Sequence, residues 1–310
     1  MAQNIKVEIF SFSFKQDRDE RIFRLVDDFD QENQTLPFWD FVRHFANEVF
    51  DSFIIDEDKK ETYSRYKNPV IFEDLKEASF QIHHGKYGLK EILISQQGEE
   101  QGVKRSDQSG AKPYFGLISC DTGGRAYLAL QYYGNDGILT RLKKEIRHVF
   151  RQEYGNWQIK IEGCSSVALL LRLIDKNPIE ELFFSRKRLP RDKADALGFR
   201  GDNELQTQIK FIANRGNLPI GNEIKRFLTQ SGSTVINWSG LSDLGINGEH
   251  ETKVKISLDG ILRTIPLDQP ESFKIRYDVS NEVTVDADGY PNEIELLKVA
   301  RAFLNTFETQ

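Results

Sequence analysis

Hydrophobic and polar positions alternate most clearly in the middle of the chain. Tyr114–Cys120 and Arg125–Tyr133 each predict a β-strand, and the turn Asp121–Gly124 between them favours a β-hairpin. Two further strands are predicted at Trp157–Ile161 and Ile179–Phe184. We therefore expect the fold to be organised around this central stretch.

Two helices are predicted between these strands. Arg141–Gln152 follows Thr140, a suitable N-cap, and has one apolar face. Val167–Ile174 follows Ser165 and Ser166 and is apolar on all sides, so we expect it deep in the core. The resulting order, ββαβαβ, predicts helices packed against a mixed sheet.

The N-terminal part predicts one strand and two helices. Ile5–Phe14 alternates, but its apolar residues change phase half-way, which indicates a bulge or burial of both faces. Asp17 or Asp19 is a suitable N-cap for an amphipathic helix over Ile22–Phe29. Phe38–Val49 predicts the second helix, and the many phenylalanines indicate an aromatic core.

Polar segments separate the remaining elements. Asp56–Lys67 is expected to be an exposed loop or helix end, and Gln96–Lys112 a long surface loop. Between them, strands are predicted at Phe80–His83 and Leu89–Ser95.

Ser185–Asn203 is charged and contains Pro and Gly, so it is the candidate linker. The elements predicted after it are a strand at Glu204–Ala213, a helix at Ile220–Gln230, a hairpin of Val254–Leu258 and Ile261–Leu267, and short strands at Phe273–Tyr277 and Glu282–Val285. A final helix is predicted from Pro291, with Ile294, Leu297, Ala300 (or Val299) and Leu304 on its inner face.

These elements predict an α+β protein with a mixed, mainly antiparallel sheet and packed helices, followed by a smaller α+β C-terminal part. The expected domains are residues 1–190, which contain the basic helix 141–152, and residues 204–310, joined by a linker at residues 191–203. A length of 310 residues allows one large or two ordinary domains.

The composition places the chain among globular proteins. It has 39% hydrophobic and 29% charged residues, and two cysteines, which are too few for a disulfide framework or a cysteine-rich zinc site. The start, MAQNIKVEIF, lacks the pattern of a signal peptide, and no apolar run is long enough for a membrane span. We therefore expect a cytoplasmic protein that is not attached to a membrane.

The charge is distributed unevenly along the chain, whose net charge is -6. Residues 141–200 carry 14 basic and 8 acidic side chains, whereas residues 1–80 carry 11 basic and 18 acidic ones. A basic segment beside an acidic one creates a directional electrostatic field, which bears on binding partners.

The predicted helix 141–152 and the segment after Phe184 contain the basic residues that could form one patch. Such a patch could bind the phosphates of DNA or RNA without sequence specificity, in a salt-dependent manner. The alternative is a solvated helix face followed by an ordinary basic linker. The candidate phosphate-binding residues are Lys143, Lys144, Arg147, Arg151, Arg186, Lys187, Arg188 and Arg191.

The other motifs favour a structural role over catalysis or ligand binding. Gly134–Gly137 lacks the Lys-Ser/Thr of a phosphate-binding loop, so a simple turn is favoured. Asp286–Gly289 resembles half of a calcium loop without its remaining ligands, which again favours a turn. His83 and His84 lack a metal-ligand partner at a known spacing, so an exposed pair at a turn is expected.

A metal-dependent nuclease needs carboxylates and a lysine on adjacent strands. Asp243, Glu251 and Lys253 are the nearest candidates, but Glu251 and Lys253 do not lie inside an apolar strand. Cys120 and Cys164 are expected to be small buried residues rather than nucleophiles. No catalytic residue, metal or cofactor is predicted.

Several segments match a known pattern: HHGKYG, KPYFGLI, RAYLALQYYGNDGILTRLKKEI and FFSRKRLP. With them, residues of about 85–197 resemble a family of uncharacterised prokaryotic and phage-associated proteins of similar length. The resemblance implies an accessory or antiviral-defence component, and it implies no activity.

Three hypotheses follow. The first is a non-enzymatic nucleic-acid-binding component of a bacterial antiviral-defence or stress system. The second is a protein-interaction or oligomerisation subunit, in which the acidic N-terminal region meets a basic partner or a second copy of the chain. The third is a divalent-metal-dependent nuclease.

Overall fold

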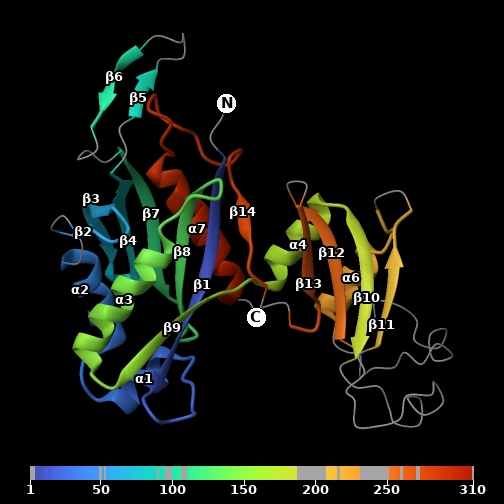
Figure 1. Ribbon diagram of the computed structural model, residues 1–310. Coiled ribbons are helices and arrows are strands. Elements are labelled where there is room, and N and C mark those ends of the chain that lie inside the picture. The colour runs from blue at the N-terminus through green and yellow to red at the C-terminus, as the bar shows by residue number, and fades with distance from the viewer. Residues whose placement is uncertain are drawn as a thin grey trace, which may run out of the picture. The chain divides into compact units, whose positions relative to one another are not determined.

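The structure is a computed structural model, and the residues that it describes fall into several ranges. These are residues 4–48, 51, 54–88, 91–94, 100–105, 110–186, 207–214, 217–230, 251–258, 261–269 and 273–308. They form helices and antiparallel strands, so the predicted α+β class with a mainly antiparallel sheet is confirmed (Figure 1).

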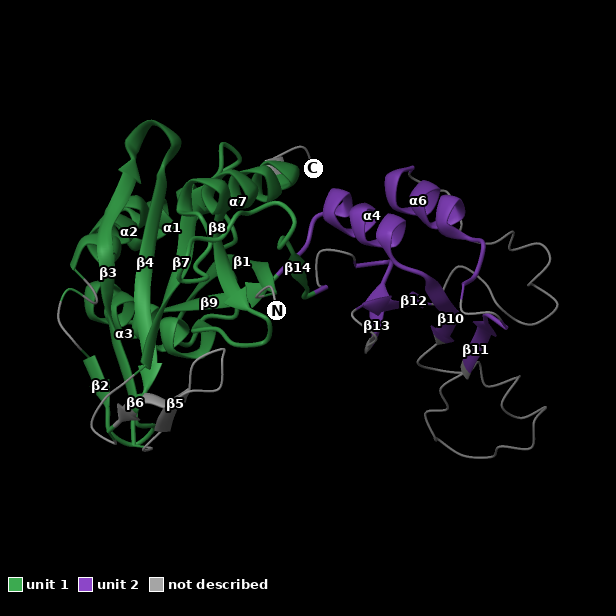
Figure 2. Cartoon of the chain, turned by 90° about the horizontal axis from the view of Figure 1, so that it is seen from above, with its two compact units in different colours: residues 1–163, 274–309 green, residues 164–273, 310 purple. Residues whose placement is uncertain are grey.

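The chain forms two compact units (Figure 2). The first contains Met1–Gly163 and Lys274–Thr309, and the second contains Cys164–Phe273. This differs from the expected division into residues 1–190 and 204–310, and the predicted linker 191–203 lies outside the described residues. The reason is strand pairing: β14 (Arg276–Asp278) pairs with the N-terminal strand β1 (Ile5–Gln16), so the last part of the chain returns to the first unit.

The first unit is built on one large antiparallel sheet with the order β14-β1-β8-β7-β4-β3-β2, in which β9 also pairs with β1. A separate two-stranded sheet is formed by β5 and β6. The bounds of these strands are β2 Ile54–Asp56, β3 Glu61–Phe72, β4 Glu77–Lys86, β5 Glu91–Ile94, β6 Glu100–Lys104, β7 Gly110–Cys120, β8 Ala126–Tyr133 and β9 Trp157–Gly163. The central hairpin β7–β8 is the one predicted from the sequence.

Helices cover both faces of this sheet (Figure 1). On one face lie α1 (Val26–Asn33), α2 (Phe38–Glu48) and α3 (Leu139–Tyr154). On the other lies α7 (Glu293–Glu308), where the Phe307 ring lies 4.8 Å from the ring of Tyr127 on β8. A short 3-10 helix, η1 (Glu73–Leu75), joins β3 to β4.

Strand β1 is buried on both faces, which explains its change of phase. Ile5, Val7 and Ile9 face α7, while Phe10, Phe12 and Phe14 face α1–α3. The pairing of β1 with β8 and β9 runs without a register shift, so of the two expected explanations double burial is the correct one.

The expected aromatic core lies under α1–α3. The ring of Phe14 is 4.1 Å from that of Phe29 and 5.9 Å from that of Phe150, and the Phe29 and Phe38 rings are 6.5 Å apart. Such edge and offset contacts add to the free energy gained from burying the rings. The two N-terminal helices are thereby fixed to β1 and α3.

Two predicted elements at the N-terminal side need correction. The first helix begins at Val26 rather than near Ile22, because Phe23 forms two backbone hydrogen bonds of 2.8 Å with Phe14 and extends the sheet there. Asp56–Lys67 is not a loop or helix end. It contains the end of β2 and half of β3, where Tyr63 is fully buried opposite His84.

Other corrections concern loops and the last helix. The segment Gln96–Lys112 contains β6 and the start of β7, so it is not one continuous loop. In the final helix Ala300 and Leu304 are buried as predicted. Leu296 and Phe303 are buried as well, whereas Ile294 is 66% exposed rather than on the inner face. The predicted strand Glu282–Val285 is a turn with one isolated bridge.

The described residues of the second unit form a four-stranded antiparallel sheet and two helices. The strand order is β11-β10-β12-β13, with bounds β10 Ile179–Arg186, β11 Thr207–Ile212, β12 Glu251–Leu258 and β13 Ile261–Pro266. The helices are α4 (Val167–Lys176) and α6 (Gly221–Thr229). Ser166 caps α4 as expected, accepting a 3.2 Å hydrogen bond from the Leu169 N–H, but Ala168 is exposed, so α4 is not buried on all sides.

Among the helices that the structure describes, none is both long and apolar enough to cross a membrane.

Candidate functional site

The predicted basic helix is α3, and its cationic residues lie on its outer side. Lys144, Arg147 and Arg151 are exposed, while Lys143 is half-buried against the Phe10 ring, 5.2 Å from its centroid. Burial lowers the pKa of Lys143, and the nearby charges of Arg147 and Lys274 lower it further.

Two of these cations already face carboxylates from the first eighty residues. The Lys144 Nζ lies 3.8 Å from Asp56, and Arg151 pairs with Asp17 at 3.2 Å. Arg147 forms no ion pair with any carboxylate that the structure describes. The free positive charge on α3 is therefore smaller than the sequence suggests.

The other predicted phosphate-binding residues, which follow Phe184 in the sequence, are not part of the first unit as far as the structure describes them. Arg186 is the last residue of β10 in the second unit, whereas α3 belongs to the first. Lys187, Arg188 and Arg191 lie outside the described residues. A single surface that combines both groups stays a prediction.

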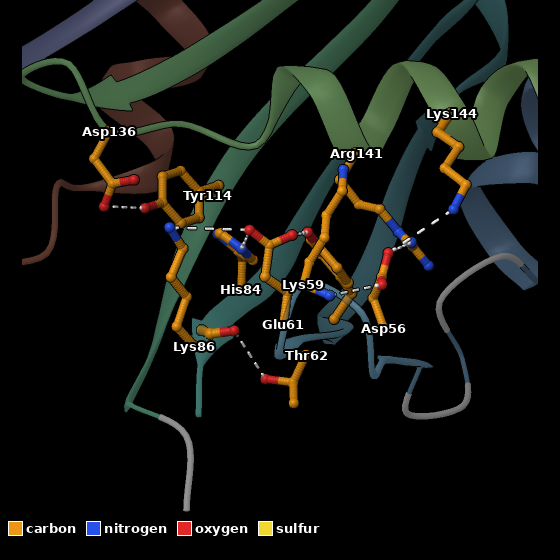
Figure 3. Close-up of polar contacts among 12 residues, drawn as sticks. Asp56, Lys59, Glu61, Thr62, His84, Lys86, Tyr114, Asp136, Arg141 and Lys144 are labelled. Carbon is orange, nitrogen blue, oxygen red and sulfur yellow. Dashed lines mark hydrogen bonds and ion pairs between the residues drawn. The ribbon is translucent and has the colours of Figure 1, made fainter. Parts of the chain in front are cut away.

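A buried polar cluster that the sequence analysis missed anchors α3 to the edge of the sheet (Figure 3). Arg141, the first cation of the helix, is only 8% exposed and pairs with Asp56 at 2.8 Å and with Glu145 at 2.7 Å. Its guanidinium also lies 4.6 Å from the centroid of the Tyr63 ring. Arg141 is therefore a structural cation rather than part of an outer basic surface.

The histidine pair lies inside β4 rather than at an exposed turn, so that prediction is wrong. His84 is buried, stacks on Tyr63 with ring centroids 4.7 Å apart, and has its Nε2 4.0 Å from Glu61 (Figure 3). Burial lowers the pKa of both His83 and His84. The described part of the chain contains no group of three or more His, Cys, Asp or Glu side chains suited to hold a metal ion.

The two glycine-containing turns are turns, as expected. In Gly134–Gly137, Tyr133 and Asp136 exchange backbone hydrogen bonds, and the Asp136 carboxylate accepts a 2.8 Å hydrogen bond from the Tyr114 hydroxyl. In Asp286–Gly289, the Asp286 carboxylate accepts hydrogen bonds from its own loop, including the Tyr290 N–H at 2.8 Å.

The remaining candidates offer little for catalysis. Of the proposed nuclease residues, Glu251 and Lys253 pair with each other at 2.7 Å on β12, and Asp243 lies outside the described residues. Cys120 and Cys164 are buried, as expected, and burial raises the pKa of the Cys120 thiol to about 12. A thiol with so high a pKa is a poor nucleophile at neutral pH.

A cavity of about 710 Å³ in the first unit is lined mainly by acidic side chains. It lies where α1, α2, η1, the β7–β8 turn and α7 meet, and we call it the acidic cleft. Six carboxylates and two cations line it, which gives a net charge of -4. The charged residues are Asp27, Asp30, Asp40, Asp74, Glu77 and Asp121, with Lys76 and Arg301.

The carboxylates of the acidic cleft differ in whether they already form ion pairs or hydrogen bonds within the protein. Glu77 is buried and pairs with Arg301 at 2.7 Å, and Asp30 accepts a 2.8 Å hydrogen bond from the Phe38 N–H. Burial raises the pKa of Asp30. Asp27 and Asp74 are exposed, and neither forms an ion pair with a cation in the described ranges.

Apolar groups lie beside these charges. Leu75 is 54% exposed, and Trp39 is half-buried with its indole N–H donating a 2.9 Å hydrogen bond to Glu73. Tyr127 and Leu304 add buried surface. The acidic cleft therefore combines negative charge with apolar surface that a ligand could cover.

Sequence reasoning found the acidic surplus of residues 1–80 but not the acidic cleft. Asp121 comes from the β7–β8 turn and Arg301 from α7, so the site depends on tertiary packing that no local pattern reveals.

No protein-family model matches the chain, and a search of the curated proteins finds no significant match.

Proposed function

We propose that the protein is an interaction component whose acidic cleft binds a basic, partly apolar segment of a partner protein. This is the second of the hypotheses drawn from the sequence. The observation that carries it is the net charge of -4 around a cavity of about 710 Å³ that also exposes Leu75. Opposite charge favours encounter, and exposed apolar surface favours a lasting complex.

The unpaired carboxylates define the expected contacts. Asp27 and Asp74 are available to arginine or lysine side chains of the partner because they are exposed and have no cationic neighbour within ion-pair distance in the described part of the chain. Trp39 and Leu75 would contact apolar residues between those cations. The cytoplasmic location expected from the composition is part of this proposal. So is a role in antiviral defence or stress, for which the family resemblance is the reason.

The proposal can be tested with a short fluorescein-labelled peptide of alternating Arg and Leu residues. Fluorescence anisotropy should show binding that weakens with added salt. The double variant Asp27→Asn/Asp74→Asn should raise the Kd roughly threefold to tenfold, since each exposed ion pair contributes up to about 1 kcal/mol.

A matched control separates this site from the overall negative charge. The double variant Glu20→Gln/Asp28→Asn removes the same charge from exposed positions that do not line the acidic cleft. It should bind the peptide as the unaltered protein does. Equal weakening by both double variants would contradict the proposal.

Nucleic-acid binding is the second candidate function. It is favoured by a shallow groove on the outer face of α3 that Lys144, Arg147, His148 and Arg151 line. The Lys144 and Arg151 side chains are exposed, so both could turn to phosphates at little cost. Asp56, which is only 10% exposed, would keep its ion pair with Arg141.

A mobility-shift titration with duplex DNA and with RNA, at two salt concentrations, tests this candidate. The triple variant Lys144→Gln/Arg147→Gln/Arg151→Gln should weaken binding and reduce its salt dependence. The triple variant Arg24→Gln/Lys210→Gln/Lys298→Gln, which removes exposed cations elsewhere, should not. Absence of binding at low salt would exclude the candidate.

A further inference from the structure

A second cavity of the first unit, of about 400 Å³, lies at the N-terminal end of α7, against the face of the sheet opposite to α1–α3. We call it the amide pocket. Its volume is within the range of small-ligand sites. Gln81 of β4, Gln131 of β8 and three tyrosines, Tyr66, Tyr133 and Tyr290, contribute to its lining.

Two side-chain amides of the amide pocket are buried and incompletely bonded. Gln131 is 1% exposed and Gln81 is 7% exposed. The Gln131 Nε2 and the Gln81 Oε1 have no hydrogen-bond partner among the described residues. Leaving such a group unpaired costs roughly 1–3 kcal/mol, so each amide indicates a partner outside the protein chain.

The orientation of Gln131 is fixed by the backbone. Its Oε1 accepts a 3.0 Å hydrogen bond from the Phe115 N–H, which leaves the Nε2 as the free donor. The Gln131 amide lies near the Tyr133 hydroxyl and lowers its pKa, against the larger rise that burial causes. The hydroxyl itself donates a 2.8 Å hydrogen bond to the Pro113 carbonyl, and the Gln131 Nε2 is not placed to form a hydrogen bond with it.

The two amides converge on the same stretch of β7. Gln81 is the register partner of Phe115 on one side of β7, and Gln131 bonds to Phe115 from the other side. The free acceptor and the free donor therefore reach the amide pocket from the two strands that flank β7, whose backbones lie about 10 Å apart. A ligand that satisfies both must carry a donor on one edge and an acceptor on another.

The charged groups of the amide pocket are already satisfied. Lys67 pairs with Glu293 at 3.2 Å, and Asp286 accepts hydrogen bonds from its own loop. The first turn of α7 is capped by Asn292, whose Oδ1 accepts from the Ile294 and Glu295 N–H groups. The pocket therefore favours a neutral ligand over an anion.

We infer that the amide pocket binds a neutral planar heterocycle of the nucleobase type. The ligand N–H would donate to the Gln81 Oε1, and a ring nitrogen or carbonyl oxygen on another edge of the ligand would accept from the Gln131 Nε2. The tyrosine rings supply flat apolar surface, which suits a planar ring. This inference is independent of the acidic cleft and of α3, because neither shares a lining residue with this pocket.

Isothermal titration of the full chain with the four ribonucleosides tests the inference. At least one nucleoside should bind with a Kd below about 1 mM. Methylation of its donor nitrogen should weaken binding tenfold or more. If none of the four binds, water satisfies the two amides and the inference is overturned.

Variants of the two amides complete the test. Gln81→Met removes the acceptor at similar volume, and Gln131→Glu replaces the free donor while keeping an acceptor for the Phe115 N–H. Each should weaken binding tenfold or more, while Gln208→Glu, an exposed glutamine on β11, should leave it unchanged. Circular dichroism checks that Gln131→Glu is folded. If Gln131→Glu does not fold, the binding measured with the uncharged variant Gln81→Met decides the test. Binding that is unaffected in folded Gln81→Met contradicts the inference.

Discussion

At the residue scale, the sheet leaves no room for a side chain at Gly116 on β7. A Cβ built there would lie 2.6 Å from the Phe80 ring, closer than non-bonded carbon atoms approach. Phe80 also contacts Phe45 of α2, with ring centroids 6.4 Å apart. Gly116 therefore allows an aromatic side chain of the neighbouring strand to lie flat across β7.

Gly116→Ala should lower the free energy of unfolding by about 1–3 kcal/mol, because the Phe80 ring must move inside a packed core. Urea unfolding followed by circular dichroism measures the change. Gly110→Ala is the control, since a Cβ there meets no atom within 4 Å. Equal stability of the two variants would contradict the close packing at Gly116.

Arg141 and Lys144 share the Asp56 carboxylate but differ in burial, so they offer a second comparison. Arg141→Met should destabilise the protein by about 3 kcal/mol, because it leaves Asp56 and Glu145 without their buried partner. Lys144→Met should cost less than about 1 kcal/mol, since Lys144 is exposed. Thermal and urea unfolding of both variants checks this order, and the reverse order would be inconsistent with it.

His84 should make stability depend on pH. Burial lowers its pKa in the folded state, so the unfolded chain binds the proton more tightly and protonation favours unfolding. The contribution is complete above the unfolded pKa of about 6.5 and is lost as the pH falls below it. His84→Phe, which keeps a ring beside Tyr63, should lose less stability than the unaltered protein between about pH 7 and about pH 5. Urea unfolding at both pH values measures the difference, and equal losses would contradict it.

At the element scale, helices and strands were predicted correctly where the turn residues and the apolar pattern of the segment match the packing around it. The β7–β8 hairpin and α3 were predicted because turn residues and apolar periodicity coincide there. The first helix was placed too early, because the pairing of Phe23 with Phe14 overrides a helical apolar pattern. β3 was missed, because only Thr62 and Tyr63 are buried in that strand and most of its other residues are polar.

The candidate sites were less predictable than the elements. The basic residues of α3 were visible in the sequence, but their pairing with Asp17 and Asp56 is a property of the fold. Likewise, Gln81 and Gln131 are ordinary polar residues until two strands place them beside Phe115. Sequence reasoning therefore gave the charge distribution but not the sites.

At the scale of the whole molecule, the second unit is an insertion between two neighbouring strands of the first. β9 pairs with the C-terminal half of β1 and β14 with its N-terminal half. The points where the chain leaves and re-enters the first unit are adjacent, since a Cβ at Gly163 would lie 2.8 Å from the Lys274 side chain. Insertions are tolerated best where the two ends lie so close together.

Replacement of residues 164–273 by a short Gly-Ser linker should therefore leave the first unit folded. The shortened chain should keep a cooperative urea transition and the near-ultraviolet circular dichroism of its buried tyrosines, because its core cluster contains no residue of the second unit. A non-cooperative transition would contradict the independence of the first unit.

The double burial of β1 also has a consequence for synthesis of the protein on the ribosome. Ile5, Val7 and Ile9 are translated long before α7, which covers their face of the sheet and begins only at Glu293. That apolar face stays unshielded while the residues between β1 and α7 are translated, so a nascent chain exposes it throughout that part of elongation. Messages truncated before the α7 codons should accordingly yield products that bind chaperones or aggregate.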